Sequence, residues 1–176
     1  MPIKGRKDKQ TVNSEGKSVQ KLIEGVKIRT AKTVTDDRGT VCEMFSIDWN
    51  FHPEPLVFAY QVTIRPKVIK GWVVHRSYDD RTFVSRGTIK FVLYDDRPKS
   101  PTYKSINIFH FDEYNRALIT IPRGVFHALQ NVGKDDAYFY NMPTKTYNHA
   151  SPDKERLPIN TKLIPYRFES FDATSG

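Results

Sequence analysis

Hydrophobic and polar residues alternate along most of the chain in short runs, which is the pattern of half-buried β-strands. The runs recur about every 8–12 residues, and turn-forming glycine, proline and aspartate separate them. They cover residues 26–33, 40–47, 58–64, 68–75, 82–93 (two strands hinged at a glycine), 106–111, 118–121 and 137–141. No stretch has sustained helical periodicity, so the sequence predicts an all-β sandwich or barrel.

The stretch 121–131 combines a sharp corner with a strand that carries a histidine. Pro122 fixes its own φ angle, and Gly124 can adopt a backbone conformation that a Cβ would resist. On the strand that follows, His127, Leu129 and Asn131 share one face. The spacing Pro-x-Gly-x-x-His-x-x-x-Asn resembles the second motif of the cupins, small β-barrels whose interior holds a metal or a sugar. The alternative is a histidine that is simply satisfied inside a β core.

The two ends of the chain differ from the middle. Residues 1–24 are basic and lack apolar periodicity, so we expect a flexible tail. The domain then spans 25–168, and 169–176 forms a second tail. After Tyr147, prolines recur too often for a long helix, so we expect irregular chain with one short helical turn near 152–155.

Composition narrows the function class. The 176 residues suit one domain, and a net charge of +8 leaves an acidic partner open. Nucleic acid is not the expected partner, because the basic residues cluster in the tail and the strands lack interleaved aromatic and basic residues. One cysteine, Cys42, excludes a disulfide framework and a cysteine-rich metal site. No apolar stretch is long enough for a signal core or a membrane span, so we expect a cytoplasmic protein with no membrane partner.

Several motifs agree in order and spacing with one known family. They are Asp36-Asp37-Arg38-Gly39 followed by Glu43, Lys70-Gly71-Trp72, Arg86-Gly87 before an apolar strand and Asp96-Arg97, Ser100-Pro101-Thr102, and the stretch 121–127. From about residue 27 to 166, the chain resembles the dTDP-4-dehydrorhamnose 3,5-epimerases, a cupin branch that works on nucleotide-linked 4-keto sugars. The resemblance implies a jelly-roll barrel without metal or cofactor, usually a homodimer. It also implies that Arg38 lies near the nucleotide phosphates and that Glu43 contacts the nucleotide.

Glu43 shares a face of the run 40–47 with Val41 and Phe45. A carboxylate on an inward face must be paired or must meet a polar ligand, because burying it alone is costly. The alternative is that this end of the strand is exposed and Glu43 is simply hydrated.

The chemistry of the resembled family is abstraction of a proton beside a ketone, followed by reprotonation on the opposite ring face. It needs a neutral imidazole as base, a carboxylate that orients it, a phenol as acid, and a group for the enolate oxygen. Here the positions of the base, the acid and the supporting acid are occupied by Val73, Asn141 and Thr161.

Strand geometry offers a replacement for the base. Residues 73 and 75 point to the same face, about 7 Å apart along the strand, so His75 enters the same cavity one step further on. Related 4-keto-sugar cupins carry Gly-x-His-x-His here, and this chain keeps the second histidine. The alternative is that His75 is a rim residue paired with Asp79 or Asp80.

The acid and the substrate contacts complete the predicted site. Asn141 shares its strand face with Phe139 and not with Tyr140, so the acid is sought elsewhere, at Tyr60 or Tyr147. We therefore expect His75 and His127 as the catalytic residues. We expect six residues to bind the substrate: Arg38, Glu43, Gln61, Lys70, Arg81 and Asn141.

A metal-binding cupin needs His-x-His and a glutamate from its first motif, together with the histidine of its second. Val73 removes one ligand, and no glutamate follows His75 within a dozen residues. We therefore expect no bound metal, and we place His110 and His149 at the surface or the rim.

Two functions from different classes follow. The first is an epimerase or isomerase of a nucleotide-diphospho-4-keto-6-deoxy-sugar. The second is a cupin that binds a sugar nucleotide without turning it over. A homodimer is expected in both cases, since the predicted first strand 26–33 is placed to pair with the sheet of a neighbour.

Overall fold

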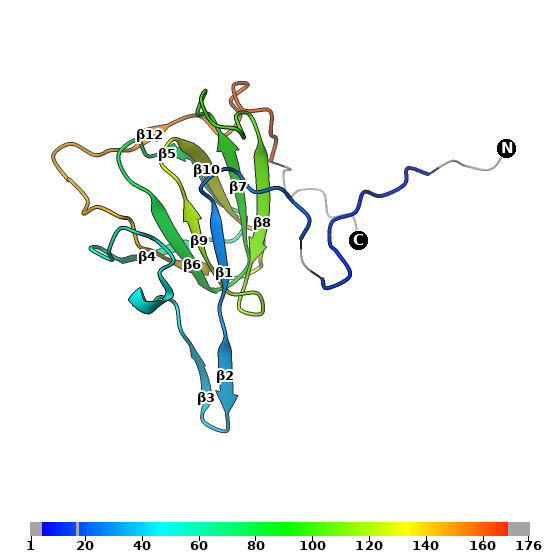
Figure 1. Cartoon of the computed structure of the whole chain (residues 1–176), viewed down its shortest axis with the longest axis vertical. Helices are drawn as coiled ribbons and strands as arrows, with labels where there is room; N and C mark the ends of the chain where they lie inside the picture. The colour runs from blue at the N-terminus through cyan, green and yellow to red at the C-terminus, as the bar shows by residue number, and fades with distance from the viewer. Residues whose placement is uncertain (1–4, 17, 169–176) are drawn as a thin grey trace.

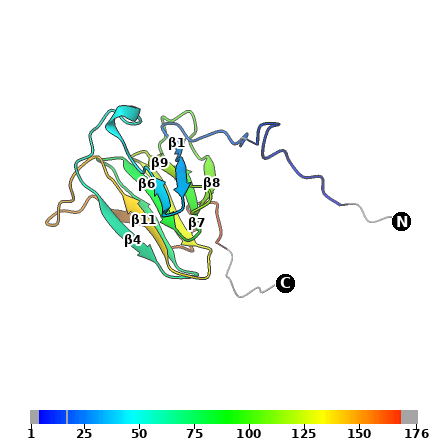
Figure 2. The same cartoon turned by 90° about the horizontal axis from the view of Figure 1, so that it is seen from below.

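Two antiparallel five-stranded sheets face each other in the computed structural model, which describes residues 5–16 and 18–168 (Figures 1 and 2). One sheet has the order β1-β9-β6-β11-β4 and the other β12-β5-β10-β7-β8, while β2 and β3 pair only with each other. The strands are β1 (Lys27–Thr30), β2 (Thr33–Asp36), β3 (Gly39–Cys42), β4 (Tyr60–Ile64), β5 (Ile69–Val74), β6 (Asp80–Arg86), β7 (Ile89–Asp95), β8 (Ile106–Phe111), β9 (Ala117–Ile121), β10 (Val125–Asn131), β11 (Ala137–Asn141) and β12 (Glu155–Arg156), with a short 3₁₀-helix η1 (Ile47–Trp49) before β4. The predicted all-β double-sheet barrel is confirmed.

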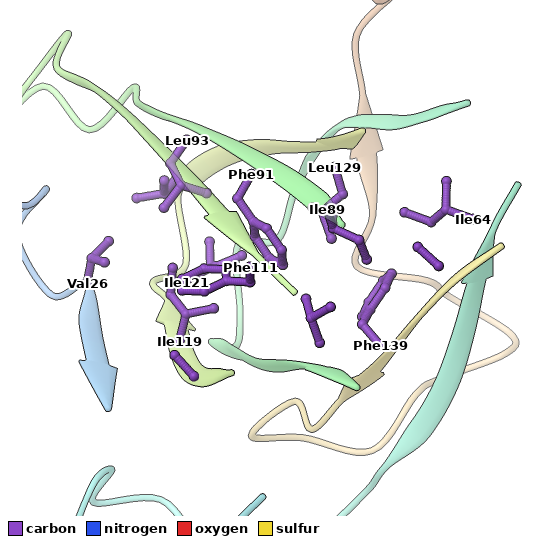
Figure 3. Close-up of a cluster of buried hydrophobic side chains, with 14 of the residues drawn as sticks. Val26, Ile64, Ile89, Phe91, Leu93, Phe111, Ile119, Ile121, Leu129 and Phe139 are labelled. Atoms are coloured by element: carbon purple, nitrogen blue, oxygen red, sulfur yellow. The ribbon is translucent and has the colours of Figure 1, made fainter. Parts of the chain in front are cut away.

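Alternating residues of the facing strands fill the space between the sheets (Figure 3). On β7, the alternate residues Ile89, Phe91 and Leu93 belong to this core and are fully buried. The same core includes Leu129 of β10 and Phe139 of β11, which also line the cavity described below. The packed core therefore forms one wall of that cavity.

Three predicted elements differ from the structure. The predicted strand 26–33 is divided, because β1 ends at Thr30 and β2 begins at Thr33. The predicted strand 40–47 ends at Cys42, since β3 has no partner except β2, and Ser46 then caps η1. The helical turn near 152–155 is wrong: Glu155 and Arg156 form β12, because the edge of β5 offers backbone partners there.

The N-terminal segment joins the barrel shortly before β1. Described residues up to 22 are exposed, whereas Ile23 is buried and its backbone N–H donates to Asn107 Oδ1 at 2.7 Å. The predicted C-terminal tail, 169–176, lies outside the described residues. In the described part of the chain, no helix has the length and apolar character to span a membrane.

Candidate active site

A cavity of about 210 Å³ opens between the two sheets. Strands from both sheets line it, and so does the segment that leads into β12. Its polar side chains are those of Tyr60, Lys70, His75, Asp80, Thr82, His127, Asn141, Lys154 and Arg156.

An irregularity in β5 sets which residues face this cavity. Val73 pairs with His127 but Lys70 pairs with Leu129, so β5 has one more residue than β10 between these pairs. Gly71 lies at this bulge with φ +140°, and a Cβ there would be 2.6 Å from the Cα of Ala128. Because of the bulge, Lys70 and Val73 both line the cavity although they are three residues apart.

His75, directly after β5, is buried and tightly positioned. Its ring stacks on Tyr78 with centroids 4.3 Å apart, and its Nδ1 lies 2.8 Å from the backbone carbonyl oxygen of Asp153. A carbonyl oxygen only accepts, so Nδ1 carries the proton of the neutral ring. The other nitrogen, Nε2, then has a free lone pair and lies 3.4 Å from Asp80 Oδ2.

His127, on β10, approaches the same carboxylate from the facing side. Its Nδ1 lies 3.4 Å from the carbonyl oxygen of Val125, its Nε2 lies 3.7 Å from Asp80 Oδ2, and its ring centroid is 5.8 Å from that of His75. Burial lowers the pKa of His127 to about 4, although the Asp80 carboxylate acts in the opposite direction. The ring is therefore neutral at pH 7.

Asp80 links the histidines to a tyrosine through an amide. It is the first residue of β6, and its Oδ1 accepts a hydrogen bond from Asn141 Nδ2 at 2.8 Å. The same Nδ2 donates to the hydroxyl oxygen of Tyr60 at 2.8 Å, and Thr82 fixes the amide by donating to its Oδ1 at 2.9 Å. Burial raises the pKa of Tyr60, so this hydroxyl keeps its proton and can donate it into the cavity.

Three cationic residues, Lys70, Lys154 and Arg156, lie at the cavity mouth, where they remain exposed. The pKa of Lys154 is lowered, first by partial removal of its ammonium from water and then by Arg156 and Lys70, while Asp80 opposes the shift. Three positive charges at one mouth suit an anionic group of a ligand.

The cavity brings together four of the residues predicted from sequence: Lys70, His75, His127 and Asn141. His75 is paired with Asp80, as the alternative expectation had it, but it is buried and does not lie at the rim.

Four other predicted residues lie outside the cavity lining. Gln61 is exposed, as is Glu43, for which the hydrated alternative holds. Arg38 lies in the turn of the β2–β3 hairpin with an exposed side chain paired to Asp36. Arg81 is fully buried, and its guanidinium donates to backbone carbonyls; the acceptors are those of Glu54, Pro55, Met142 and Pro143. This geometry gives Arg81 a structural role in place of the predicted contact with the substrate.

Sequence reasoning missed Lys154 and Arg156, and it named Asp80 only as an alternative partner of His75. Asp80 fell within a predicted turn. It is the first residue of β6 and shares a strand face with Thr82, and this placement could have indicated that its carboxylate enters the cavity. Lys154 fell within the predicted helical turn near 152–155, and Arg156 fell within chain expected to be irregular. Tyr60 was one of two alternatives for the acid and lines the cavity, whereas Tyr147 does not.

The arrangement suits proton transfer. Two imidazole lone pairs, a carboxylate, a protonated phenol and an ammonium group line one small cavity, which is the set that moving a proton beside a carbonyl requires.

Comparison with known proteins agrees with this chemistry. Residues 20–161 match the family described as dTDP-4-dehydrorhamnose 3,5-epimerase. The chain belongs to the dTDP-4-dehydrorhamnose 3,5-epimerase family. Its cupin fold, expected from the resemblance, is confirmed by a dTDP sugar isomerase from Desulfovibrio desulfuricans G20, with a TM-score of 0.76, 25% identity, and coverage of 82% of this chain and 90% of that one.

Two curated proteins are similar to this chain in sequence. The probable low-salt glycan biosynthesis epimerase Agl13 of Haloferax volcanii is 33% identical over 140 residues, which is 78% of this chain and 89% of that protein. The spore coat polysaccharide biosynthesis protein SpsL of Bacillus subtilis is 31% identical over 149 residues, which is 85% of this chain and 98% of that protein.

Val73, where the family resemblance predicts a base histidine, lines the cavity together with His75. An imidazole two residues after Val73 thus lies inside the same cavity.

Proposed function

We propose that the protein is an epimerase or isomerase of a nucleotide-diphospho-4-keto-6-deoxy-sugar, most simply one linked to dTDP. The observation that carries the proposal is the buried His75–Asp80–His127 cluster inside a cavity with a cationic mouth. Membership of the family and the names of Agl13 and of the dTDP sugar isomerase support the same reaction class.

In the proposed reaction, a carbon atom next to the ketone loses its proton to the Nε2 lone pair of His75 or His127. The electron pair of the C–H bond becomes the enolate π bond, and negative charge develops on the former ketone oxygen. Asp80 stabilises the imidazolium, and Lys154 provides positive charge for the enolate oxygen. Protonation of the same carbon by Tyr60 from the opposite face restores the ketone with inverted configuration.

The diphosphate of the substrate is proposed to bind at Lys70 and Arg156, since phosphate oxygens need charged donors and these side chains lie at the mouth. A homodimer and a cytoplasmic location, both predicted from the sequence, are kept as parts of this proposal.

Proton exchange tests the proposal directly. Incubated in deuterated water with dTDP-4-keto-6-deoxyglucose, the protein should incorporate deuterium beside the ketone. Because proton transfer by a positioned base contributes about 10²–10⁴-fold, the double variant His75→Asn with His127→Asn should lose at least 10² of the exchange rate. His110→Asn, an exposed histidine, is the matched control and should exchange at the normal rate. Absence of exchange with every nucleotide-linked 4-keto sugar would reject the proposal.

The second candidate is a sugar-nucleotide-binding protein without turnover. It is supported by the residues Val73, Asn141 and Thr161, which stand where the family resemblance predicts the base, the acid and the supporting acid. In that case dTDP-sugars or UDP-sugars should raise the melting temperature while no deuterium is incorporated.

A further inference from the structure

Two imidazole nitrogens and one carboxylate oxygen converge in the cavity. The Nε2 atoms of His75 and His127 lie 3.4 and 3.7 Å from the same oxygen, Asp80 Oδ2. None of these three atoms forms a hydrogen bond within the described residues, 5–16 and 18–168. The other carboxylate oxygen of Asp80, Oδ1, accepts a hydrogen bond from Asn141.

The hydrogen-bond partners of the two Nδ1 atoms orient the rings so that each Nε2 faces Asp80. Each Nδ1 faces a backbone carbonyl oxygen, that of Asp153 for His75 and that of Val125 for His127. Since a carbonyl can only accept, Nδ1 of each ring carries a proton, and Nε2 is the nitrogen of each ring that faces Asp80. Two nitrogens and one carboxylate oxygen that face one another in this way can hold a cation between them.

Donation of the remote ring nitrogen to a backbone carbonyl is also the usual support of a metal-ligating histidine. Two histidines and one carboxylate on one side of a cavity, with space opposite for water or substrate, form the ligand set of many first-row transition metal sites. We propose that His75, Asp80 and His127 bind one divalent first-row transition metal ion.

The distances fit such an ion with a small adjustment. Metal–nitrogen and metal–oxygen bonds of about 2.0–2.2 Å place neighbouring ligand atoms roughly 3–3.5 Å apart. The three ligand atoms here all lie within 4.8 Å of one another. A rotation of the side chains that closes the widest gap by roughly 1 Å completes the site.

From the sequence we expected no metal, because no glutamate follows His75 within a dozen residues. The structure supplies an aspartate, Asp80, five positions along the chain, where β6 begins. A strand from the opposite sheet thus provides the carboxylate that the sequence pattern of metal cupins places elsewhere.

The ammonium of Lys154 should weaken the binding of a metal ion at this site, and this effect can be tested. Lys154 interacts electrostatically with both Asp80 and His127, so its ammonium repels a cation bound between them. Replacing it with the uncharged Lys154→Met should strengthen metal binding, whereas general damage to the fold would weaken it.

Cobalt(II) is the probe, added to untagged full-length protein that has been treated with a chelator. Titration calorimetry should show that one equivalent of cobalt(II) binds, and the bound cobalt should have a visible d–d absorption band. Zinc(II) should displace it. Asp80→Asn and His127→Gln should each weaken cobalt binding by more than the 10- to 100-fold that loss of an outer-shell partner typically costs. His110→Gln should leave it unchanged, and Lys154→Met should tighten it severalfold. Circular dichroism and melting temperature show that each variant is folded.

Cobalt affinity that is the same in wild type, Asp80→Asn and His127→Gln would overturn the metal site, as would an absence of binding at millimolar cobalt. This outcome leaves the proposed function intact, because deuterium exchange is measured separately on chelator-treated protein. A metal would occupy the lone pairs that the proposed reaction uses, so the loaded protein should exchange at least tenfold more slowly. Faster exchange after loading would keep the metal site and reject the histidines as bases.

Discussion

Tyr60 has the hydrogen-bonding pattern expected of a proton donor. Its hydroxyl oxygen accepts from Asn141, so its own proton is free, and burial raises its pKa above the ordinary value. We expect Tyr60→Phe to lower epimerase turnover by about 10²-fold, the lower range for loss of a general acid. Binding of dTDP, measured by calorimetry, should not change. Tyr114→Phe, at a side chain that is 92% exposed, is the control, and equal turnover in both variants would contradict the assignment.

Arg81 is a structural residue according to its contacts. Its fully buried guanidinium bridges the loop at Glu54 to the end of β11 by donating to backbone carbonyl oxygens. Arg81→Met should therefore lower the free energy of unfolding by about 3 kcal/mol or more, because buried acceptors are left without donors. Urea denaturation measures this loss. Arg38→Met, at the exposed hairpin turn, should stay within about 0.5 kcal/mol of wild type, and a similarly small effect at Arg81 would refute its structural role.

At the scale of single residues, the sequence could predict whatever depends on strand alternation alone. It placed His75 and His127 in the cavity because residues two apart on a strand share a face. It could not predict that Asp80 meets both histidines, since that contact joins strands of different sheets. Nor could it predict that Arg81 is buried and donates to backbone carbonyls, because this depends on the loop at Glu54 and Pro55 covering the outside of β6.

At the scale of elements, the Asp96-Arg97 and Ser100-Pro101-Thr102 motifs act as a structural clamp. Its centre is the buried Asp95, whose carboxylate accepts hydrogen bonds from Arg97, Ser100 and Thr102 at 2.6–3.0 Å. Thr102 Oγ1 and Arg97 Nη2 in turn bind the backbone of Glu24. These family motifs therefore fasten the N-terminal segment to the end of β7, away from the cavity.

The clamp predicts a pH dependence of stability. Burial alone would raise the pKa of Asp95, but the hydrogen bonds from Arg97, Ser100 and Thr102 outweigh it and lower the pKa to about 2. The folded protein thus holds this proton more weakly than the unfolded chain, so the contribution is complete above about pH 4 and is lost as the pH falls through 2. Between pH 5 and pH 2, wild type should lose about 2 kcal/mol more than Asp95→Asn in urea denaturation.

Asp37→Asn, at an exposed carboxylate of the hairpin turn, is the control for this pH dependence. It should lose stability in parallel with wild type over the same range. Parallel curves for wild type and Asp95→Asn would show that the clamp does not hold Asp95 ionised.

The segment 152–156 shows why the local sequence did not predict the strand that forms there. Pro152 and the polar residues after it favour a helical turn locally. Pairing of Glu155 and Arg156 with β5, together with the Arg76–Glu155 ion pair at 2.9 Å, overrides that preference. Such pairing depends on an edge strand more than 70 residues earlier in the chain, which local patterns do not contain.

At the scale of the whole molecule, the β2–β3 hairpin extends away from the barrel (Figure 1). A two-stranded hairpin is at best marginally stable in water by itself. Val34 and Val41 are paired across it, and their side chains are 68% and 70% exposed. An isolated hairpin with an apolar pair facing solvent indicates a surface that packs against another chain.

A second copy of the protein is the partner that we predict, since two-fold homodimers are the commonest soluble oligomers and the family resemblance implies one. β1 lies at the edge of its sheet, so its outer side is open to pairing, as predicted for the first strand. Arg38, at the turn of the hairpin, lies outside the lining of its own cavity. In a dimer it would reach the phosphates of a substrate only in the cavity of the second copy.

Sedimentation velocity tests the dimer with the intact chain. Deleting the whole first strand is unsuitable, because Ile23 and Val26 belong to the core, so point substitutions on the hairpin are preferable. Wild type should sediment as a dimer at micromolar concentration, and Val34→Lys combined with Val41→Lys should sediment as a monomer, because two charges would be buried at the contact. Tyr114→Lys should remain dimeric, as should a variant that lacks residues 1–20. A dimer that tolerates both lysines would place the interface elsewhere, and a monomeric wild type would reject the homodimer.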